Sequence, residues 1–187
     1  MIYTPDGESV IQGGTLFNSS NKEFEGGVSL GYKGKFGIIN AEYQNFNREL
    51  QLHEDPSEDP DATPNQKLVT NHFEASGNFY LNKDLQIEPV FSYEIQSRKE
   101  FESSEDKAKN DAALNLYLKS FISDVKLNHN LTKNISGSVG LSFESQNNQS
   151  LGIEKLIPNY NADNFGIYLM EKMEMKKFTF SLGGRFD

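Results

Sequence analysis

The strongest constraint on the fold is a strict alternation of apolar and polar residues that recurs in separate segments of the chain. Successive side chains of a β-strand point to opposite faces of a sheet, so a period of two predicts a strand with one apolar and one polar face. In the clearest segment only Val90 interrupts the polar row. The apolar row of that segment consists of Leu85, Ile87, Pro89, Phe91, Tyr93 and Ile95.

Similar alternation predicts about eight strands after an irregular start at residues 1–24. Short turns alternate with long polar loops at about 51–66, 99–111 and 147–164. Pro56, Pro60 and Pro64 exclude regular structure from the first of these loops. The first short turn spans residues 33–35, and Gly34 is expected to adopt a positive φ there.

The segment 111–131 allows two interpretations. Its apolar residues alternate from Leu114 to Leu118 and then change phase at Phe121, which in a strand indicates a β-bulge. The alternative is a helix, because several apolar residues also follow helical spacing, with Ser103 or Ser104 upstream as a cap. Those residues are Leu114, Leu118, Phe121, Ile122 and Val125. The residues alone leave both readings open.

Alternating short turns and long loops are typical of outer-membrane β-barrels, in which the short turns face the periplasm and the long loops face outside. The chain is therefore predicted to be all-β, an antiparallel up-and-down segment of a transmembrane β-barrel. Such barrels carry aromatic girdles at both membrane interfaces. The candidates for girdle positions near predicted strand ends are Tyr32, Phe36, Phe79, Tyr80, Phe101 and Phe178.

The composition argues against other classes of protein. A net charge of -9 disfavours nucleic-acid binding, which needs a basic surface. No run of about 18 apolar residues occurs, so no transmembrane helix is predicted. The absence of cysteine excludes disulfides and thiol chemistry. The first residues lack the basic and apolar regions of a signal peptide, so an exported barrel is expected to begin upstream of Met1.

Several short motifs follow one another between about residue 25 and residue 187. Residues 60–67 (PDATPNQK) open a strand after an acidic loop, and residues 97–101 (SRKEF) lie at the outer end of the next strand. Residues 156–160 (LIPNY), 164–168 (NFGIY) and 181–187 (SLGGRFD) come later. In this order and spacing the motifs resemble the mid-barrel region of TonB-dependent outer-membrane receptors.

The resemblance implies a large barrel, of about 22 strands in this family, closed by a plug domain. It implies a place in the bacterial outer membrane, in contact with its lipid, and import of a scarce ligand such as a ferric chelate (siderophore), haem or cobalamin. Energy for import comes from the TonB complex. The plug, the TonB box and the closing C-terminal strand are not recognised in this sequence, so an interior barrel fragment is expected. The resemblance also favours a strand at 111–131, and it leaves open whether a surface lipoprotein is a further partner.

An acidic loop is the first place to look for ligand contacts, because outer loops touch the ligand in this family. The candidate ligand-binding residues are His53, Glu54, Asp55, Glu58, Asp59 and Asp61, together with Arg98 beyond the loop. Carboxylates and an imidazole are able to hold a metal ion, but the usual ligand spacing is missing, and a solvated polar loop is the simpler reading. For Arg98, pairing with an acid on a neighbouring strand is the alternative to contact with an anionic chelate.

No catalytic chemistry is predicted. The three histidines, His53, His72 and His129, are far apart in the sequence, and no nucleophile motif accompanies them. No cofactor is expected, and the chain is not expected to be an enzyme. Two other classes of protein remain as alternatives: a small or porin-like outer-membrane barrel, and a soluble β-sandwich binding module whose apolar faces meet each other.

Overall fold

One eight-stranded sheet forms nearly the whole of the protein. The computed structural model describes residues 11–12, 15–16, 19–52 and 63–187. The strands of the sheet are β3 (Asn21–Gly34), β4 (Gly37–Gln51), β5 (Asn65–Tyr80), β6 (Leu85–Phe101), β7 (Leu114–Thr132), β8 (Ile135–Ser150), β9 (Tyr160–Met175) and β10 (Phe178–Phe186). Two short strands, β1 (Ile11–Gln12) and β2 (Thr15–Leu16), pair with each other, and one short helix, α1 (Ser104–Lys109), follows β6.

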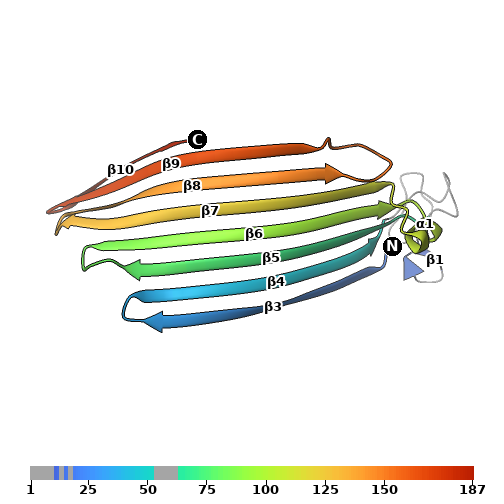
Figure 1. Ribbon diagram of the computed structural model, residues 1–187, viewed down its shortest axis with the longest axis horizontal. Helices are drawn as coiled ribbons and strands as arrows, with labels where there is room; N and C mark the ends of the chain where they lie inside the picture. Colours follow the sequence, from blue (N-terminus) through green and yellow to red (C-terminus); the bar gives the residue numbers. More distant parts are fainter. Residues whose placement is uncertain (1–10, 13–14, 17–18, 53–62) are drawn as a thin grey trace.

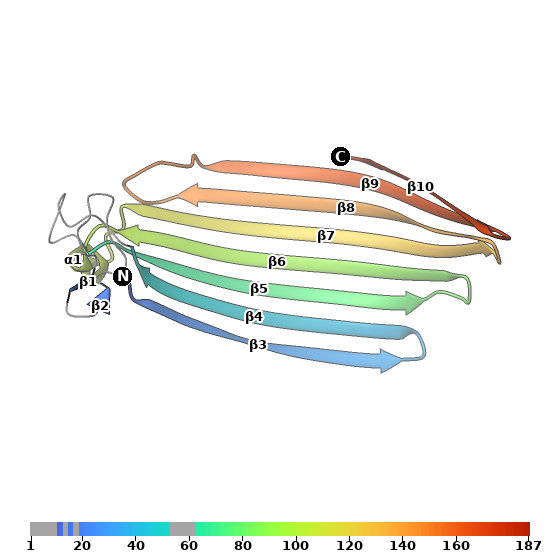
Figure 2. The same cartoon turned by 180° about the vertical axis from the view of Figure 1, so that it is seen from behind.

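The strands follow one another in space in the order of the sequence, and every neighbouring pair is antiparallel. All the short turns lie at one end of the sheet, and the long connections with α1 lie at the other (Figures 1 and 2). The predicted all-β, up-and-down arrangement of eight strands is therefore confirmed.

The segment that allowed two readings is a strand, β7, which pairs with β6 from Leu114 to His129 without interruption. The β-bulge predicted near Phe121 is wrong, because the pairing of β7 with β8 shifts only between Asn130 and Thr132, beside the turn. In an unbroken strand, residues of even and odd number face opposite sides of the sheet. The change of phase therefore places Leu118 on one face and Phe121 on the other.

The strands extend further into the long connections than alternation predicted. β8 continues to Ser150 and β9 begins at Tyr160, although the residues there are mostly amides and hydroxyls. The hydrogen bonds between paired strands join backbone groups, so a strand can continue where the side chains on both of its faces are polar. The helix α1 was not predicted either; the Ser103 side chain caps it by accepting a hydrogen bond from the Asp106 N–H, 3.1 Å away.

The positive φ expected at Gly34 occurs at Gly37 instead, where φ is 135°. The turn residues between β3 and β4 are Lys35 and Phe36, whereas the sequence predicted a turn at residues 33–35. A Cβ atom on Gly37 would lie 1.9 Å from the carbonyl oxygen of Asn78 on β5. Glycine is thus required both by backbone conformation and by the close approach of the neighbouring strand.

The register defines two faces. Residues directly opposite each other on paired strands point to the same side of a sheet. Face A carries one continuous set of partners that includes Ala41, Ala75 and Phe91, and face B carries the set that includes Glu42, Glu74 and Ser92. A row of aromatic rings crosses face A about midway along the strands. This aromatic row consists of Tyr43, Phe73, Tyr93, Phe121, Phe143 and Phe165.

Polarity changes sides at the aromatic row. In the turn half of the sheet, between this row and the short turns, face A is mostly apolar and face B is mostly polar. In the loop half, between the row and the long connections, face A carries mostly amides and lysines. Face B of the loop half carries a group of apolar side chains, which are Phe46, Leu50, Leu68, Leu114, Leu116 and Leu118.

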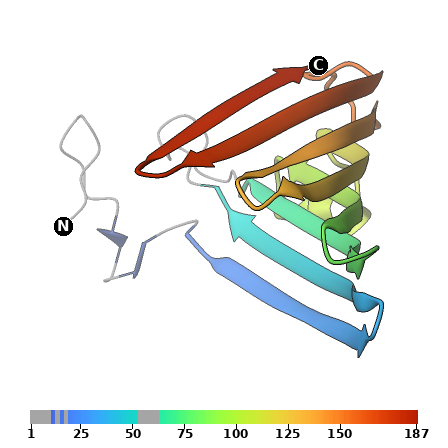
Figure 3. The same cartoon turned by 90° about the vertical axis from the view of Figure 1, so that its left-hand side faces the viewer.

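The sheet is a single layer without a conventional core. Among the described residues, the apolar side chains classed as buried are Phe101, Ala112 and Leu114, all near the long connections. Large apolar residues on face A are strongly exposed: Leu30 is 71 % exposed and Leu182 is 76 % exposed. Figure 3 shows the layer from the turn end, curved into an open arc with β3 and β10 at its two margins. The sheet is not closed into a barrel.

Gly37→Ala is expected to destabilise the sheet by about 1–3 kcal/mol, because alanine is strained at this φ and its Cβ would displace the β5 backbone. Urea denaturation of the refolded chain, followed by circular dichroism, measures the loss. Gly184→Ala on β10 is the control, since no atom lies within 4 Å of the added Cβ, and its unfolding midpoint should stay within error of the original. Equal midpoints for the two variants would contradict this account of Gly37.

Candidate functional site at the loop end of the sheet

The acidic-loop candidates, His53, Glu54, Asp55, Glu58, Asp59 and Asp61, lie outside the described residues. The connection that contains them joins β4 to β5 at the loop end. The remaining candidate, Arg98, lies on β6 at that end, and its side chain points to face B. The structure therefore places one of the seven predicted residues, at the end of the sheet where all were expected.

Arg98 is paired with a carboxylate on its own strand. Its Nε donates to Glu100 Oε1 over 3.0 Å, and Gln66 on β5 donates to the same oxygen over 2.6 Å. This contact agrees with the predicted pairing of Arg98 with an acid, although the acid lies on the same strand and not on a neighbouring one. The side chain of Arg98 remains 46 % exposed. A cation on face B is thus held in a fixed position yet accessible from solvent.

A second arginine lies in the same register row. This row crosses four strands. Its members, from β4 to β7, are Arg48, Leu68, Arg98 and Leu116. Arg48 Nε donates to Asn21 Oδ1 over 3.0 Å and lies 3.6 Å from Glu23 Oε2. Guanidinium groups and leucines therefore alternate across four strands.

Rows on either side add further apolar side chains. Phe46 and Leu118 lie one row nearer the turns, and Leu114 lies one row nearer the connections, where it is 3 % exposed. Sequence reasoning missed this combination, because the residues come from four separate strands. We call the group of Phe46, Arg48, Leu68, Arg98, Leu116 and Leu118 the loop-end patch. Such a surface is suited to a ligand that combines apolar groups with negative charge.

The helix α1 is fixed to the end of the sheet by polar contacts. Ser104 N–H donates to Thr63 Oγ1 over 2.9 Å, and Lys107 Nζ lies 3.1 Å from Glu49 Oε2. Lys67 Nζ lies 3.5 Å from the other oxygen of Glu49. A small hollow of about 260 Å³ lies between α1, β3 and β4, lined by residues that include Ser104, Lys107 and Glu49.

The hydrogen bond from Lys107 holds the pKa of Glu49 below its ordinary value of 4.5, and the charge of Lys67 contributes to this shift. The carboxylate therefore stabilises the folded state fully at pH values above 4.5. That contribution is lost as the pH falls through the lowered pKa of the folded state. Glu49 is more than one-third exposed, so solvent screening keeps its effect on stability small.

Face B is rich in carboxylates on both sides of the aromatic row. Glu42 and Glu74 are direct register partners, and His72 lies 4.0 Å from Glu74 Oε2 and 3.5 Å from Glu94 Oε2. Lys126 Nζ pairs with Glu88 Oε2 over 2.6 Å. Within the part of the chain that the structure describes, no group of three or more His, Asp or Glu side chains is arranged to hold a metal ion.

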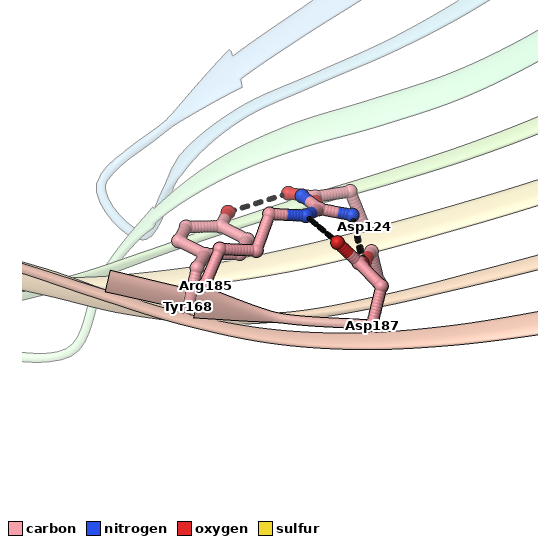
Figure 4. Close-up of polar contacts among 5 residues, drawn as sticks. Asp124, Tyr168, Arg185 and Asp187 are labelled. Atoms are coloured by element: carbon pink, nitrogen blue, oxygen red, sulfur yellow. Dashed lines mark hydrogen bonds and ion pairs between the residues drawn. The ribbon is translucent and has the colours of Figure 1, made fainter. Parts of the chain in front are cut away.

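A network of hydrogen bonds crosses β7 to β10 on the same face (Figure 4). Tyr168 donates its hydroxyl proton to Asp124 Oδ1 over 2.9 Å, passing over Gly140 on the intervening strand. Arg185 donates from Nε to Asp187 Oδ2 over 2.7 Å and from Nη2 to Ser142 Oγ over 3.1 Å. The hydrogen bonds of Tyr168 to β7 and of Arg185 to β8 thus link strands that are not direct neighbours.

No family model matches the chain, and no curated protein matches it. None of the helices in the described residues is long and apolar enough to cross a membrane.

Lys107→Gln is expected to raise the pKa of Glu49 toward 4.5, because the variant loses the hydrogen bond and the positive charge that favour the carboxylate. An NMR titration of the Glu49 side-chain carboxyl measures this pKa. Lys109→Gln is the matched control on the same helix, since Lys109 pairs with Glu105 over 2.7 Å. A Glu49 pKa that moves equally in both variants, or in neither, would refute the assigned contact.

Proposed function

We propose that this chain forms part of the wall of a transmembrane β-barrel in a bacterial outer membrane, within a receptor of the TonB-dependent type. The receptor would import a ferric chelate (siderophore), haem or a similar metal complex. Its proposed partners are the outer-membrane lipid, the TonB complex and the chelate. The proposal rests on the pattern of apolar residues on face A, supplemented by the sequence motifs that resemble this family.

The observation that carries the membrane proposal is an apolar band of constant height on face A. On five strands the band begins and ends with a large apolar residue and spans nine residues. These spans are Phe24–Tyr32, Leu85–Tyr93, Ile135–Phe143, Phe165–Met173 and Phe178–Phe186. A transmembrane β-strand needs about 9–11 residues, so each span is long enough to cross the hydrocarbon layer.

The band also runs obliquely to the strands, as expected of tilted strands. A register line from Gly37 at the first short turn passes through Ile87 and Val139 to Leu169. Relative to this line, each successive turn lies two residues further out, so the last turn, at Met175, is displaced by six residues. Figure 1 shows the turns stepping outward in this way.

This displacement gives the tilt of the strands. Six residues correspond to about 20 Å along a strand, and six strand spacings correspond to about 29 Å across the sheet. If all short turns lie at one membrane surface, the strands tilt by about 35° from the membrane normal, within the range of transmembrane barrels. Nine residues at this tilt span a height of about 22 Å, close to the apolar belt of such proteins.

Aromatic rings at both edges of the band support the same proposal. The aromatic row lies at the loop-side edge, with neighbouring rings as close as 4.6 Å between the centroids of Phe143 and Phe165. At the turn-side edge, Tyr32, Phe36 and Phe79 form a stack with centroids about 6 Å apart. Of the predicted girdle residues, Tyr80 lies on face B, and Phe101 is buried near α1.

One ion pair lies near the turn-side edge of face A. His129 Nε2 lies 2.9 Å from Glu171 Oε1, across Gly137 on the strand between them. The two groups neutralise each other when His129 is protonated, and His129 is only 11 % exposed. Pairing of this kind lowers the cost of ionisable groups beside lipid.

Transport is proposed from face B. Its polar turn half would line a water-filled interior, as expected of the inner surface of such a barrel. The loop-end patch lies at the mouth of that interior and offers apolar side chains beside two arginines. We propose this patch as a contact for the incoming chelate, with Arg98 facing its negative charge.

Two alternatives predict different outcomes. A passive or porin-like barrel shares the membrane band and lacks specific ligand binding. A soluble β-sandwich is disfavoured because both faces of the described sheet are open and the apolar residues of face A are exposed.

The membrane orientation of face A is testable by fluorescence, because the chain contains no tryptophan. Phe91→Trp places a reporter in the apolar band, and Ser92→Trp places one on face B of the same strand. Both variants are refolded into phosphatidylcholine vesicles with brominated acyl chains. The tryptophan of the Phe91→Trp variant should be quenched strongly, and that of the Ser92→Trp variant only weakly.

Tyr117→Trp, on face A of the loop half, is the control for height, and we expect little quenching there. Equal quenching at all three positions, or failure of the chain to enter vesicles, would refute the proposed membrane wall.

Specific ligand binding is tested with Leu116→Gln combined with Leu118→Gln in the loop-end patch. Ferric chelates of different charge, haem and cobalamin are titrated against the refolded chain in neutral detergent. The double variant should bind the preferred compound about 30-fold more weakly, because each glutamine removes an apolar contact of about 1 kcal/mol.

The control for this experiment is Asn115→Gln combined with Tyr117→Gln, which alters the same strand on face A. Its affinity should match that of the unmodified chain. Absence of binding to every compound would favour the passive barrel, and an equal loss in both double variants would remove the loop-end patch from the proposal.

A further inference from the structure

A basic rim lies on face A beyond the apolar band. On β7, Lys119 lies two residues from Phe121 of the aromatic row, on the side of the long connections. Further out, Lys22, Glu49, Lys67 and Lys99 occupy a single register row across β3 to β6. We use the name basic rim for Lys22, Lys67, Lys99 and Lys119.

This positive charge is unexpected in a chain whose net charge is -9. In the described strands, the carboxylates on face A of the loop half are Glu49 and Asp163, and Glu49 is already held by Lys67 and Lys107. Most strand carboxylates point to face B instead. They are Glu23, Glu25, Glu42, Glu74, Glu88, Glu94, Glu100, Asp124, Glu144 and Glu174.

The lysines of the rim are largely free of ion pairs. Among the described residues, no carboxylate forms an ion pair with Lys22, Lys99 or Lys119. Lys99 donates to the amide oxygen of Asn110 over 2.9 Å, and Lys119 Nζ lies 5.4 Å from the centroid of the Tyr117 ring. Three cations on one face thus remain available to an external anion.

Amide side chains fill the space between the aromatic row and the rim. Tyr43 donates its hydroxyl proton to Asn71 Oδ1 over 2.8 Å, and Asn45 Nδ2 donates to the same oxygen over 2.9 Å. Asn47, Asn147 and Asn161 continue this zone on face A. Amides donate and accept hydrogen bonds and so suit hydroxyl-rich groups.

The height of the rim distinguishes between lipids. Lys67 and Lys99 each lie six residues beyond the aromatic row, a rise of about 16 Å at a strand tilt of about 35°. The headgroup layer of a phospholipid bilayer adds only about 5–8 Å on each side of the hydrocarbon. The headgroup layer of a phospholipid is therefore thick enough to reach Lys119 but not Lys67 or Lys99.

We infer that the basic rim and its amides bind a membrane lipid with a phosphorylated saccharide headgroup on the loop side of the membrane. The lysines contact its phosphates, and the amides contact its sugar hydroxyls. This inference rests on the proposed membrane wall, because the headgroup reaches the rim only if face A meets lipid. Bound in this way, the lipid fixes the height and the direction of the chain in the membrane.

The test uses the full chain carrying Tyr117→Trp, refolded in a zwitterionic detergent. Tryptophan fluorescence follows titration with lipopolysaccharide, phosphatidylglycerol or inorganic phosphate. Lipopolysaccharide should bind most tightly. Lys22→Gln combined with Lys99→Gln should weaken its binding about 25-fold, since neither lysine is held by a carboxylate and each lysine near an anionic surface contributes about fivefold.

Lys83→Gln combined with Lys133→Gln is the matched control, because both lysines lie in short turns at the opposite end of the sheet. This control should keep the original affinity. Equal affinity for phosphatidylglycerol and lipopolysaccharide, or an equal loss in both double variants, would overturn the inference. Failure of brominated lipid to quench the Phe91→Trp variant would instead overturn the membrane wall, which separates the two failures.

Discussion

The ladder of backbone hydrogen bonds is the interaction on which the rest of this structure depends. A single curved layer has no second layer against which to bury its apolar side chains, and few described apolar residues are buried. What fixes each side chain is therefore its position in the register. The pairing continues from β3 to β10 with one shift, at Asn130 and Thr132. Every functional argument depends on this register, because it decides which side chains share a face.

The change of polarity at the aromatic row is the second determinant. The turn half is mostly apolar on face A, whereas in the loop half β4, β5 and β7 carry apolar side chains on face B. A sheet packed on one side by a single core has no reason to reverse in this way, since one face would stay apolar throughout. A sheet that crosses from lipid into an aqueous mouth has such a reason. Under the proposed membrane wall, the loop-end patch and the basic rim would be the two sides of the wall beyond the membrane.

Ionisable groups follow the same division. Carboxylates gather on face B along the whole length of the strands, where a water-filled interior would solvate them. On face A the charged pair of His129 and Glu171 lies close to the turn-side edge. The lysines of the basic rim occur only after the aromatic row. Charge is thus excluded from the middle of the apolar band, where its desolvation would cost most.

The sequence by itself determined the strands, their antiparallel order and the alternation of short and long connections, because a period of two is a local property of each segment. It also located Arg98 at the loop end. Only the tertiary structure decided the loop-end patch and the basic rim, since each collects residues from strands that are distant in the sequence. It also decided that Phe121 and Leu118 lie on opposite faces without a bulge. The physical reason is that register is a relation between strands, and alternation within one strand does not fix it.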